Sequence, residues 1–496
     1  LSLKTRKQAH RFMNKMPSCK HLHVQRILFR SYLLGLLPLL ALTTSRPAFA
    51  ENLIELWSHV IASNPTVRAS EYAVEQARAQ RDQALAPLLP NISVKGYYSY
   101  NSLNSSVNAN GINPFGANTR QYPGYNGSLT VSQPLFDLPS YLKLQGAAKQ
   151  TEQQEQYALA QRMEVAYKML DKYLLILEAE VMVAQLSAEA KATEVQVMRL
   201  RRMHESQMAK VTDLYEMEAY GQSIATSLIE AKNQKGIYTE ELREITGISV
   251  TQPDELVQEV FPPMQRKVDD WVEESMASNP VLLSLQYAAE SAQQMIQSAK
   301  AGHLPTASVS ASDIFSNTSY NNTQFGGLDS YNIASVYLNI NIPIYSGGGV
   351  EAGARESIQR YHISREKIEE VRRGIEKDVR TNWYNIETGR SRIDSTLKEV
   401  EFRIKAKKAQ ATSYRQGTAT IVEVLDSHKK LLKARADYYK ARYEFIRSLI
   451  RLRLHVGSLA DFDLEEISVW FKPKNRDDIN SLVKPKKADD GDWGDD

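Results

Sequence analysis

The sequence predicts a mixed α and β membrane protein built from two copies of one structural plan. Three observations support this prediction: segments about 210 residues apart match, each half contains a helical stretch of about 65 residues, and four segments alternate apolar with polar residues. A net charge of +3 with 24% charged residues produces no strong electrostatic field, so the composition does not indicate a nucleic-acid-binding protein. No run of about 18 apolar residues follows residue 50, which excludes a bundle of membrane-spanning helices.

The N-terminal segment has the pattern of an export signal. Basic residues up to Arg30 precede the apolar stretch SYLLGLLPLLALTTS, and the small side chains of AFA, Ala48–Ala50, suit signal peptidase. We expect a signal peptide over residues 1–50 and a mature chain that begins near Glu51. The one cysteine, Cys19, lies in this leader, so the mature chain has no thiol for a disulfide, a metal site or a lipid anchor. Such a chain is periplasmic, secreted, or embedded as a β-barrel.

An internal duplication is visible at matching residues along the chain. Asn64-Pro65 and Asn279-Pro280 are 215 residues apart. Similar offsets, 209 and 210, relate the prolines of SQPLFD and NIPIYS and the glycines that close the last helical run of each copy. We therefore divide the mature chain into repeat 1 over 51–260 and repeat 2 over 261–470, followed by a tail over 471–496 that we expect to be disordered.

Each copy begins with a helix and continues with two strands. The helix over about 65–86 has apolar residues at i, i+4 and a proline in its first turn, where the missing N–H is tolerated. Residues 91–100, NISVKGYYSY, then alternate apolar and polar side chains, which is the period of a half-buried strand. A loop rich in Asn, Gly and Pro over 108–127 leads to a second strand over 128–136. The matching strands of the second copy cover 306–315 and 335–345.

Long helical stretches follow over 139–204 and 350–414. An apolar seam in the first steps by three or four residues, as in a coiled coil; its members are Met163, Ala166, Leu170, Leu174, Leu177, Val181 and Ala184. At 1.5 Å per residue each stretch spans about 100 Å, which exceeds a globular domain. Each reverses at a short break, HESQMA or RQGTA, and returns as a second helix that ends at Gly247 or Gly457.

The four strands have the length and alternation needed to cross an outer membrane. Tyrosines near their ends are typical of an interfacial aromatic belt: Tyr97, Tyr98, Tyr100, Tyr122, Tyr125, Tyr331 and Tyr337. Four strands cannot close a barrel, because the smallest membrane barrels have about eight, and lipid does not tolerate an open edge. A membrane barrel made from this chain must therefore be shared between protomers. The alternative is a soluble four-stranded sheet.

Taken together, these residues resemble the TolC family of outer-membrane efflux and type I secretion duct proteins. The resemblance covers about Asn52 to Leu459 and rests on APLLP, AGHLPT, IPIYSGGGVEAGARES, VTDLYE and YRQGTATIVEVLD. It implies a homotrimer in which four strands per chain form one twelve-stranded outer-membrane β-barrel, continued by a long coiled-coil α-helical barrel in the periplasm. It also implies a passive channel without enzymatic activity or cofactor. A periplasmic adaptor protein would connect this channel to an inner-membrane efflux transporter or ABC exporter.

Glu423 and Asp426 share one face of a predicted helix, because they are three residues apart. Catalysis lacks a partner on that face, since His428 turns to another side. A solvated helix face remains an alternative. In a trimer, six carboxylates would meet at one throat, where they favour cations over anions or hold a hard cation through oxygen ligands. We expect the channel gate and its selectivity here.

By resemblance, these two acids match the inner acids of the family's closed periplasmic end. The residues that would link the helices there, or turn the chain, are Tyr414, Asp213, Thr212 and Gln196 as links and Gly417 as the turn. Three positions depart from the family pattern, and the first is Glu423, which stands where an aspartate is familiar. The basic residue of its GTxTIV stretch is Ala419 here, which predicts a looser closed state, and the glycine of the first reversal is Gln207.

A second class of function remains open, namely a trimeric coiled-coil stalk that is anchored by a barrel and has a structural or adhesive role. An adhesin would carry a large exposed passenger region, whereas the predicted surface loops have only about twenty residues each. An outer-membrane enzyme is disfavoured, because no Ser/His/acid arrangement occurs in the strands or loops.

Overall fold

The computed structural model describes residues 53–105, 118–250, 253–256, 266–318, 330–459 and 467–472. Within these ranges the chain forms eight α-helices, two short 3-10 helices and six strands. None of these helices combines the length and the apolar character of a membrane span. The predicted signal peptide over 1–50 lies outside the described residues.

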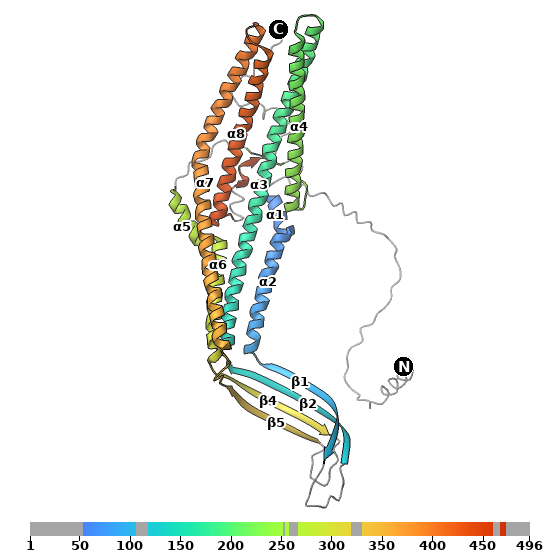
Figure 1. Cartoon of the computed structure of the whole chain (residues 1–496), viewed down its shortest axis with the longest axis vertical. Coiled ribbons are helices and arrows are strands. Elements are labelled where there is room, and N and C mark those ends of the chain that lie inside the picture. The colour runs from blue at the N-terminus through green and yellow to red at the C-terminus, as the bar shows by residue number, and fades with distance from the viewer. Residues whose placement is uncertain are drawn as a thin grey trace, which may run out of the picture. The chain divides into compact units, whose positions relative to one another are not determined.

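The two halves of the chain share one order of elements, which is what an internal duplication produces (Figure 1). The first half contains α1 (Leu53–Ser63), α2 (Pro65–Leu85), η1 (Ala86–Leu88), β1 (Asn91–Ser105), β2 (Asn118–Phe136), α3 (Leu138–Glu205), α4 (Val211–Thr246) and β3 (Glu255–Leu256). The second half contains α5 (Val268–Ser278), α6 (Pro280–Lys300), η2 (Ala301–His303), β4 (Thr306–Thr318), β5 (Ser330–Asn341), α7 (Gly349–Arg415), α8 (Ile421–Val456) and β6 (Phe471–Lys472).

Each copy of the Asn-Pro pair starts one helix and fastens the end of another. Asn64 Oδ1 accepts hydrogen bonds from two backbone N–H groups in the first turn of α2, and Asn279 Oδ1 does the same for α6. The Asn64 amide nitrogen also donates to the Ile245 carbonyl at the end of α4, at 2.8 Å. The Asn279 amide nitrogen donates to the His455 carbonyl at the end of α8, at 2.7 Å. Equivalent residues of the two repeats therefore make equivalent hydrogen bonds, as expected for a duplicated structural unit.

The sheet combines strands from both halves in the antiparallel order β1-β2-β4-β5. Its register pairs Ile92 with Val131 on one face and Thr130 with Ser312 on the other, so the first face is apolar and the second polar. Val94, on the apolar face, is 79% exposed. The outer edges of β1 and β5 have no partner strand in the described part of the chain. An exposed apolar face with two open edges is typical of a sheet that meets another chain or an apolar environment.

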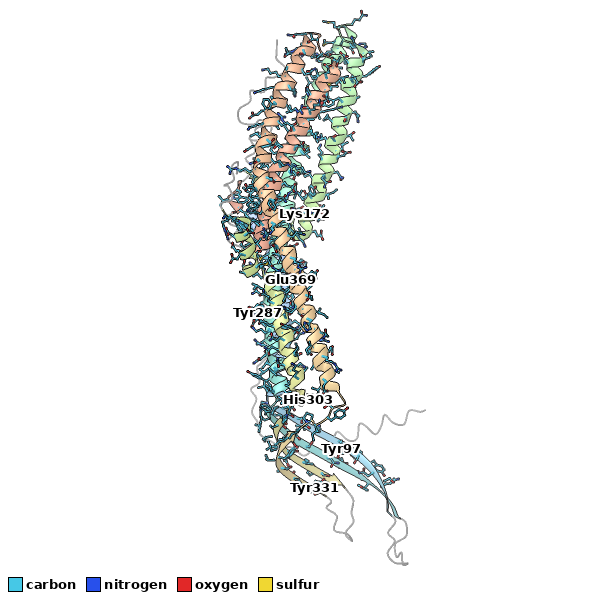
Figure 2. The ribbon with its side chains drawn as sticks, turned by 60° about the vertical axis from the view of Figure 1, so that its left-hand side comes forward. Tyr97, Lys172, Tyr287, His303, Tyr331 and Glu369 are labelled. Carbon is cyan, nitrogen blue, oxygen red and sulfur yellow. The ribbon has the colours of Figure 1, made fainter. Side chains whose placement is uncertain are left out.

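The predicted belt tyrosines lie on these strands. Figure 2 marks Tyr97 on β1 and Tyr331 on β5, and both side chains are exposed. Tyr98 packs against Tyr125 of the neighbouring strand with ring centroids 5.1 Å apart. The alternation of apolar and polar residues in the sequence thus corresponds to the apolar and the polar face of one sheet.

Two helical hairpins dominate the rest of the chain. α3 and α7 have 68 and 67 residues, or about 100 Å each. α4 packs along α3 to form hairpin 1, and α8 packs along α7 to form hairpin 2 (Figure 1). The two hairpins meet mainly where α8 packs against α3. Six of the seven predicted seam residues of α3 are buried, and Ala184 is half-buried.

Two apolar clusters hold the hairpins together. The larger one surrounds Tyr173 and Leu174 of α3 and Ile446 and Ile450 of α8, all essentially unexposed. A smaller cluster lies nearer the hairpin ends and joins α3, α4 and α8; it consists of Leu186, Leu200, Leu214, Met217, Tyr220, Ile224, Ile421 and Leu425. This smaller cluster positions the predicted gate residues.

The elements differ from the sequence prediction in several places. The short helices α1 and α5 were not predicted, β1 and β4 run five and three residues beyond their predicted ends, and β5 begins five residues earlier than predicted. Residues 118–127, predicted as loop, extend β2, because the ladder with β1 continues through them. β5 ends at Asn341 and not at 345, since Pro343 has no N–H for the ladder. Phe471 and Lys472 pair with β3, so the predicted tail starts two residues too early. Phe471 is buried, and the remainder of the tail lies outside the described residues.

Candidate functional site

The predicted gate residues gather where the two hairpins reverse. In hairpin 2, Gly417 has φ of 74° and its amide donates to the Tyr414 carbonyl at 3.0 Å. In hairpin 1, Gln207 takes the matching place with φ of 62°, and its amide donates to the His204 carbonyl at 2.8 Å. The left-handed conformation costs a residue with a Cβ roughly 1–2 kcal/mol. The missing glycine therefore leaves strain in the turn of hairpin 1.

One hydrogen bond joins the hairpins at their ends. Tyr414, in the last turn of α7, donates through Oη to Asp213 Oδ2 at 2.8 Å. Asp213 lies in the first turn of α4, where the free N–H groups favour a carboxylate. Burial and the hydrogen bond to Asp213 raise the pKa of Tyr414 to about 12, so the phenol keeps its proton at neutral pH. This tip link is a contact between the two halves of the chain.

Glu423 helps to start α8. Its Oε2 accepts the Thr420 N–H at 3.3 Å, while Thr420 Oγ1 accepts the Glu423 N–H at 3.4 Å. These reciprocal bonds form a capping box. The same carboxylate oxygen accepts a hydrogen bond from Gln410 Nε2 of α7 at 2.8 Å. Glu423 nevertheless remains exposed, so its charge faces the surroundings of the hairpin.

Asp426 lies one helical turn later and is also exposed. Lys430 Nζ lies 2.6 Å from its Oδ2, but more than half of each side chain is exposed, so this pair contributes well under about 1 kcal/mol. The buried stripe of α8 includes Ile421, Val424 and Leu425, and both acids point away from it. Across the described ranges, no group of three or more His, Cys, Asp or Glu is placed to hold a metal ion.

The other predicted link residues are not joined to hairpin 2. Thr212 is exposed at the start of α4, and Gln196 is half-buried on α3. Neither side chain forms a hydrogen bond with any residue that the structure describes. Ala419 is half-buried in the turn of hairpin 2 and brings no charge to it. The structure thus brings Tyr414 and Asp213 together, but within its described residues it gives Thr212 and Gln196 no hydrogen bond across the hairpins.

A second contact between the hairpins was missed in the sequence interpretation. His428 Nδ1 of α8 lies 2.7 Å from Glu189 Oε1 of α3, and Tyr220 Oη of α4 donates to the same oxygen at 3.0 Å. The side chains of Glu189 and His428 are each only 12% exposed. A signal was present, because His428 follows Ile421 by seven residues and Val424 by four. It therefore lies in an apolar stripe, where a polar side chain needs a partner.

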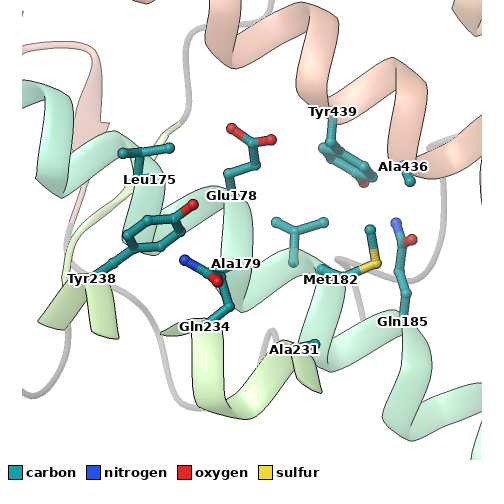
Figure 3. Close-up of a pocket in the computed structure, with 11 residues that line it drawn as sticks. Leu175, Glu178, Ala179, Met182, Gln185, Ala231, Gln234, Tyr238, Ala436 and Tyr439 are labelled. Carbon is teal, nitrogen blue, oxygen red and sulfur yellow. The ribbon is translucent and has the colours of Figure 1, made fainter. Parts of the chain in front are cut away.

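A pocket lies farther from the hairpin ends along the same junction of α3, α4 and α8 (Figure 3). Its cavity of about 190 Å³ is lined by apolar and aromatic side chains, Tyr238 and Tyr439 among them. Burial raises the pKa of Glu178 in its wall, although Arg447 Nη2 lies 3.0 Å away and opposes that shift. Gln185 Oε1 is buried there without a hydrogen-bond partner. The two hairpins are therefore incompletely packed against each other at this level.

The chain thus combines two long helical hairpins joined by polar contacts with a four-stranded sheet whose apolar face is exposed. A family model described as outer membrane efflux protein matches residues 56–248 and 271–458, which include both hairpins. The chain belongs to this outer membrane efflux protein family. The resemblance stated from the sequence is confirmed.

Individual relatives agree with this assignment. The chain is 26% identical over 423 residues to outer membrane protein TolC of Escherichia coli, with 84% of each chain covered. It is 24% identical over 431 residues to the alkaline protease secretion protein AprF of Pseudomonas aeruginosa, with 86% of this chain and 88% of AprF covered. Both relatives are aligned over most of their length.

Solved structures show the same fold. CusC superposes with a TM-score of 0.71 at 16% identity, covering 83% of this chain and 94% of that one. The Campylobacter jejuni CmeC outer membrane channel superposes with a TM-score of 0.70 at 15% identity, covering 91% and 98%. Family and relatives together identify an outer-membrane channel of the efflux or type I secretion class.

Proposed function

We propose that three copies of this chain form one passive exit duct that is gated at the hairpin ends. The observation that carries this proposal is the sheet, with its exposed apolar face and its two open edges. Three such sheets joined edge to edge give twelve strands in a closed barrel, which leaves no unpaired edge in lipid. The helices α3 and α7 would continue this barrel across the periplasm.

In this assembly the hairpin ends close the duct. Glu423 and Asp426 of three chains place six carboxylates around the throat, and such a ring favours cations over anions. The hydrogen bond from Tyr414 to Asp213 holds hairpin 2 against hairpin 1 in the closed state. Gly417 allows the tight turn that brings these residues to the end of the duct. Thr212 and Gln196 supply further links between neighbouring helices of the assembly.

The partner that opens the gate must bind the open state more tightly than the closed one. We assign this role to a periplasmic adaptor that connects an inner-membrane efflux transporter or ABC exporter. The end of hairpin 1 supports this assignment, because Met208, Val211 and Tyr215 expose large apolar surfaces there. An apolar surface at a helical end suits a helical partner. Energy comes from the transporter, and the channel itself carries out no reaction and needs no cofactor.

Single-channel conductance in a planar bilayer tests this function. The full mature protein is first shown to be a trimer by light scattering and is then compared with the double variant Glu423→Ala/Asp426→Ala. We expect a cation-preferring current whose preference is lost in the double variant. The control Asp394→Ala/Glu401→Ala removes two exposed acids of α7 far from the turn and should keep the preference.

The other possible outcomes refute different parts of the proposal. A trimer without any current refutes the duct and favours the anchored stalk. A current whose ion preference is the same in both double variants leaves the duct standing but refutes the acidic throat.

A further inference from the structure

Glu189, Tyr220 and His428, here termed the buried triad, connect both hairpins through one carboxylate. Glu189 Oε1 accepts the hydrogen bond of Tyr220 within hairpin 1 and contacts His428 of hairpin 2. The rings of Tyr220 and His428 meet edge to face, with centroids 6.3 Å apart and planes at 84°. The three side chains therefore hold one another in a single geometry. Tyr220 keeps Glu189 fixed to hairpin 1, and His428 is the component that belongs to the other hairpin.

The surroundings of the triad make this contact costly to break. The apolar cluster of α3, α4 and α8 includes Tyr220 itself together with Leu186, Met217 and Leu425. Such surroundings penalise an ionised carboxylate that lacks a charged partner. Glu189 therefore depends on the groups that approach it from the other hairpin.

The charges around Glu189 favour its ionised form. Burial by itself raises the pKa of Glu189, but the hydrogen bond with His428 and the positive charge of Lys407 on α7 outweigh burial and lower it. Lys429 of α8 adds a further cation, with Nζ 5.8 Å from the centre of the Tyr220 ring. At neutral pH, the site holds a carboxylate whose favourable partners come largely from hairpin 2.

We propose that the buried triad is a second lock of the gate, stronger than the tip link between Tyr414 and Asp213. The inference rests on the gating function proposed above. When hairpin 2 leaves hairpin 1, the contact between His428 and Glu189 must break, because the two residues lie on α8 and α3. The tip link is half-exposed, so water compensates for part of its loss. By contrast, Glu189 would remain attached to Tyr220 in an apolar setting without His428 and without the nearby positive charge of Lys407.

The lock is tested by the resting open probability of the purified trimer in planar bilayers. Glu189→Gln and His428→Ala should each raise it at least tenfold and by more than Tyr414→Phe does; a smaller effect than that of Tyr414→Phe would refute the claim that this lock is the stronger one. The double variant should exceed the larger single effect only slightly, because both changes remove the same contact. Glu194→Gln is the matched control, since it makes the same chemical change on an exposed position of α3 and should leave the open probability unchanged. Trimer content is measured for every variant.

A cross-link provides a second measurement that does not depend on destabilising variants. The sequence after residue 50 contains no cysteine, so Glu189→Cys/His428→Cys can be joined by a short, reducible bis-thiol reagent. The joined channel should stay closed under conditions that open the unjoined one, and reduction should restore opening.

The results separate the lock from the gate itself. If Tyr414→Phe raises the open probability while Glu189→Gln, His428→Ala and the cross-link all leave it at the wild-type value, the lock is refuted and the gate stands. If none of these changes alters a steadily conducting channel, the proposed gate is wrong, and the lock falls with it.

Discussion

The tip link offers the most direct test of gating, because Tyr414→Phe removes one oxygen atom and leaves the ring in place. The hydrogen bond to Asp213 measures 2.8 Å, and bonds to charged groups contribute about 1.5–3 kcal/mol. Both side chains are only half-buried, so the lower end of that range, about 1.5 kcal/mol, is appropriate. One such bond changes an equilibrium about tenfold. Three bonds that break in concert in the proposed trimer change it by about three orders of magnitude.

Single-channel recordings measure this change as the open probability of the resting channel. Tyr414→Phe should raise it at least tenfold, and Asp213→Asn should raise it as well. The double variant should match the larger single effect, because both substitutions act on one bond. Tyr384→Phe, an exposed tyrosine of the same helix, serves as the matched control and should behave as wild type. An open probability of Tyr414→Phe equal to that of the control would show that this bond does not hold the hairpins together.

Four further measurements probe other parts of the structure. Gln207→Gly relieves a left-handed conformation and should stabilise that turn by about 1 kcal/mol, slowing hydrogen exchange of the Met208 amide about fivefold. Asn279→Ala removes a helix cap and the hydrogen bond to the end of α8. The free energy of unfolding measured with denaturant should fall by about 2–3 kcal/mol. The pKa of Glu189 is lowered in the folded protein. Ionised Glu189 therefore stabilises the fold fully above the ordinary glutamate pKa of about 4.3, and this stabilisation is lost as pH falls through the lower pKa of the folded state. The difference between the thermal midpoints of wild type and Glu189→Gln should therefore be present above that glutamate value and should shrink as pH falls below it. Ala419→Arg restores the cation of the family pattern and should lower the resting conductance, whereas an unchanged conductance would contradict a looser closed state.

The long helices of the fold were predictable because their signals are local, whereas the short helices α1 and α5 were not predicted. The apolar residues of the α3 seam recur every three or four positions, which a short window of sequence reveals. Asn64 and Asn279 cap the first turns of the helices that follow them, α2 and α6. The ends of α3 and α7 fall within one residue of their predicted positions. Local propensity and tertiary packing favour the same structure along these helices, so the local sequence pattern is enough to predict them.

The extent of the strands was harder to predict because pairing depends on a distant partner. Residues 118–127 contain Gly, Pro and Asn and look like a loop on their own, yet the ladder with β1 carries them as strand. Phe471 likewise joins a two-residue strand through pairing with β3, more than 200 residues earlier. Neither feature has a periodic signal of its own. Both are decided by contacts that a single window of sequence does not contain.

The candidate site divides in the same way. Glu423 and Asp426 were identified as one exposed face of α8, and spacing alone is enough for that. Glu189 and Tyr220 could not be linked to His428 by spacing, because they lie on two other helices. His428 was assigned to another face than the acids, which agrees with its burial, but the partner on that face depended on how α8 packs against α3.

In the gate proposed above, the contacts across the junction of the hairpins would make the closed state both specific and reversible. An apolar contact tolerates sliding of one helix along another, because dispersion and burial have little directional preference. Polar contacts at the levels of Glu178, Glu189 and Asp213 each require one register of hairpin 2, since a shift by a single turn would separate every donor from its acceptor. Each contact exchanges hydration for a protein partner, so its net contribution is about 1–3 kcal/mol and a partner that solvates or substitutes the contacts can reverse the closure. The burial of the Glu189 contact then sets how tightly that partner must bind the open state, because this contact cannot be exchanged with water while the cluster around it remains packed.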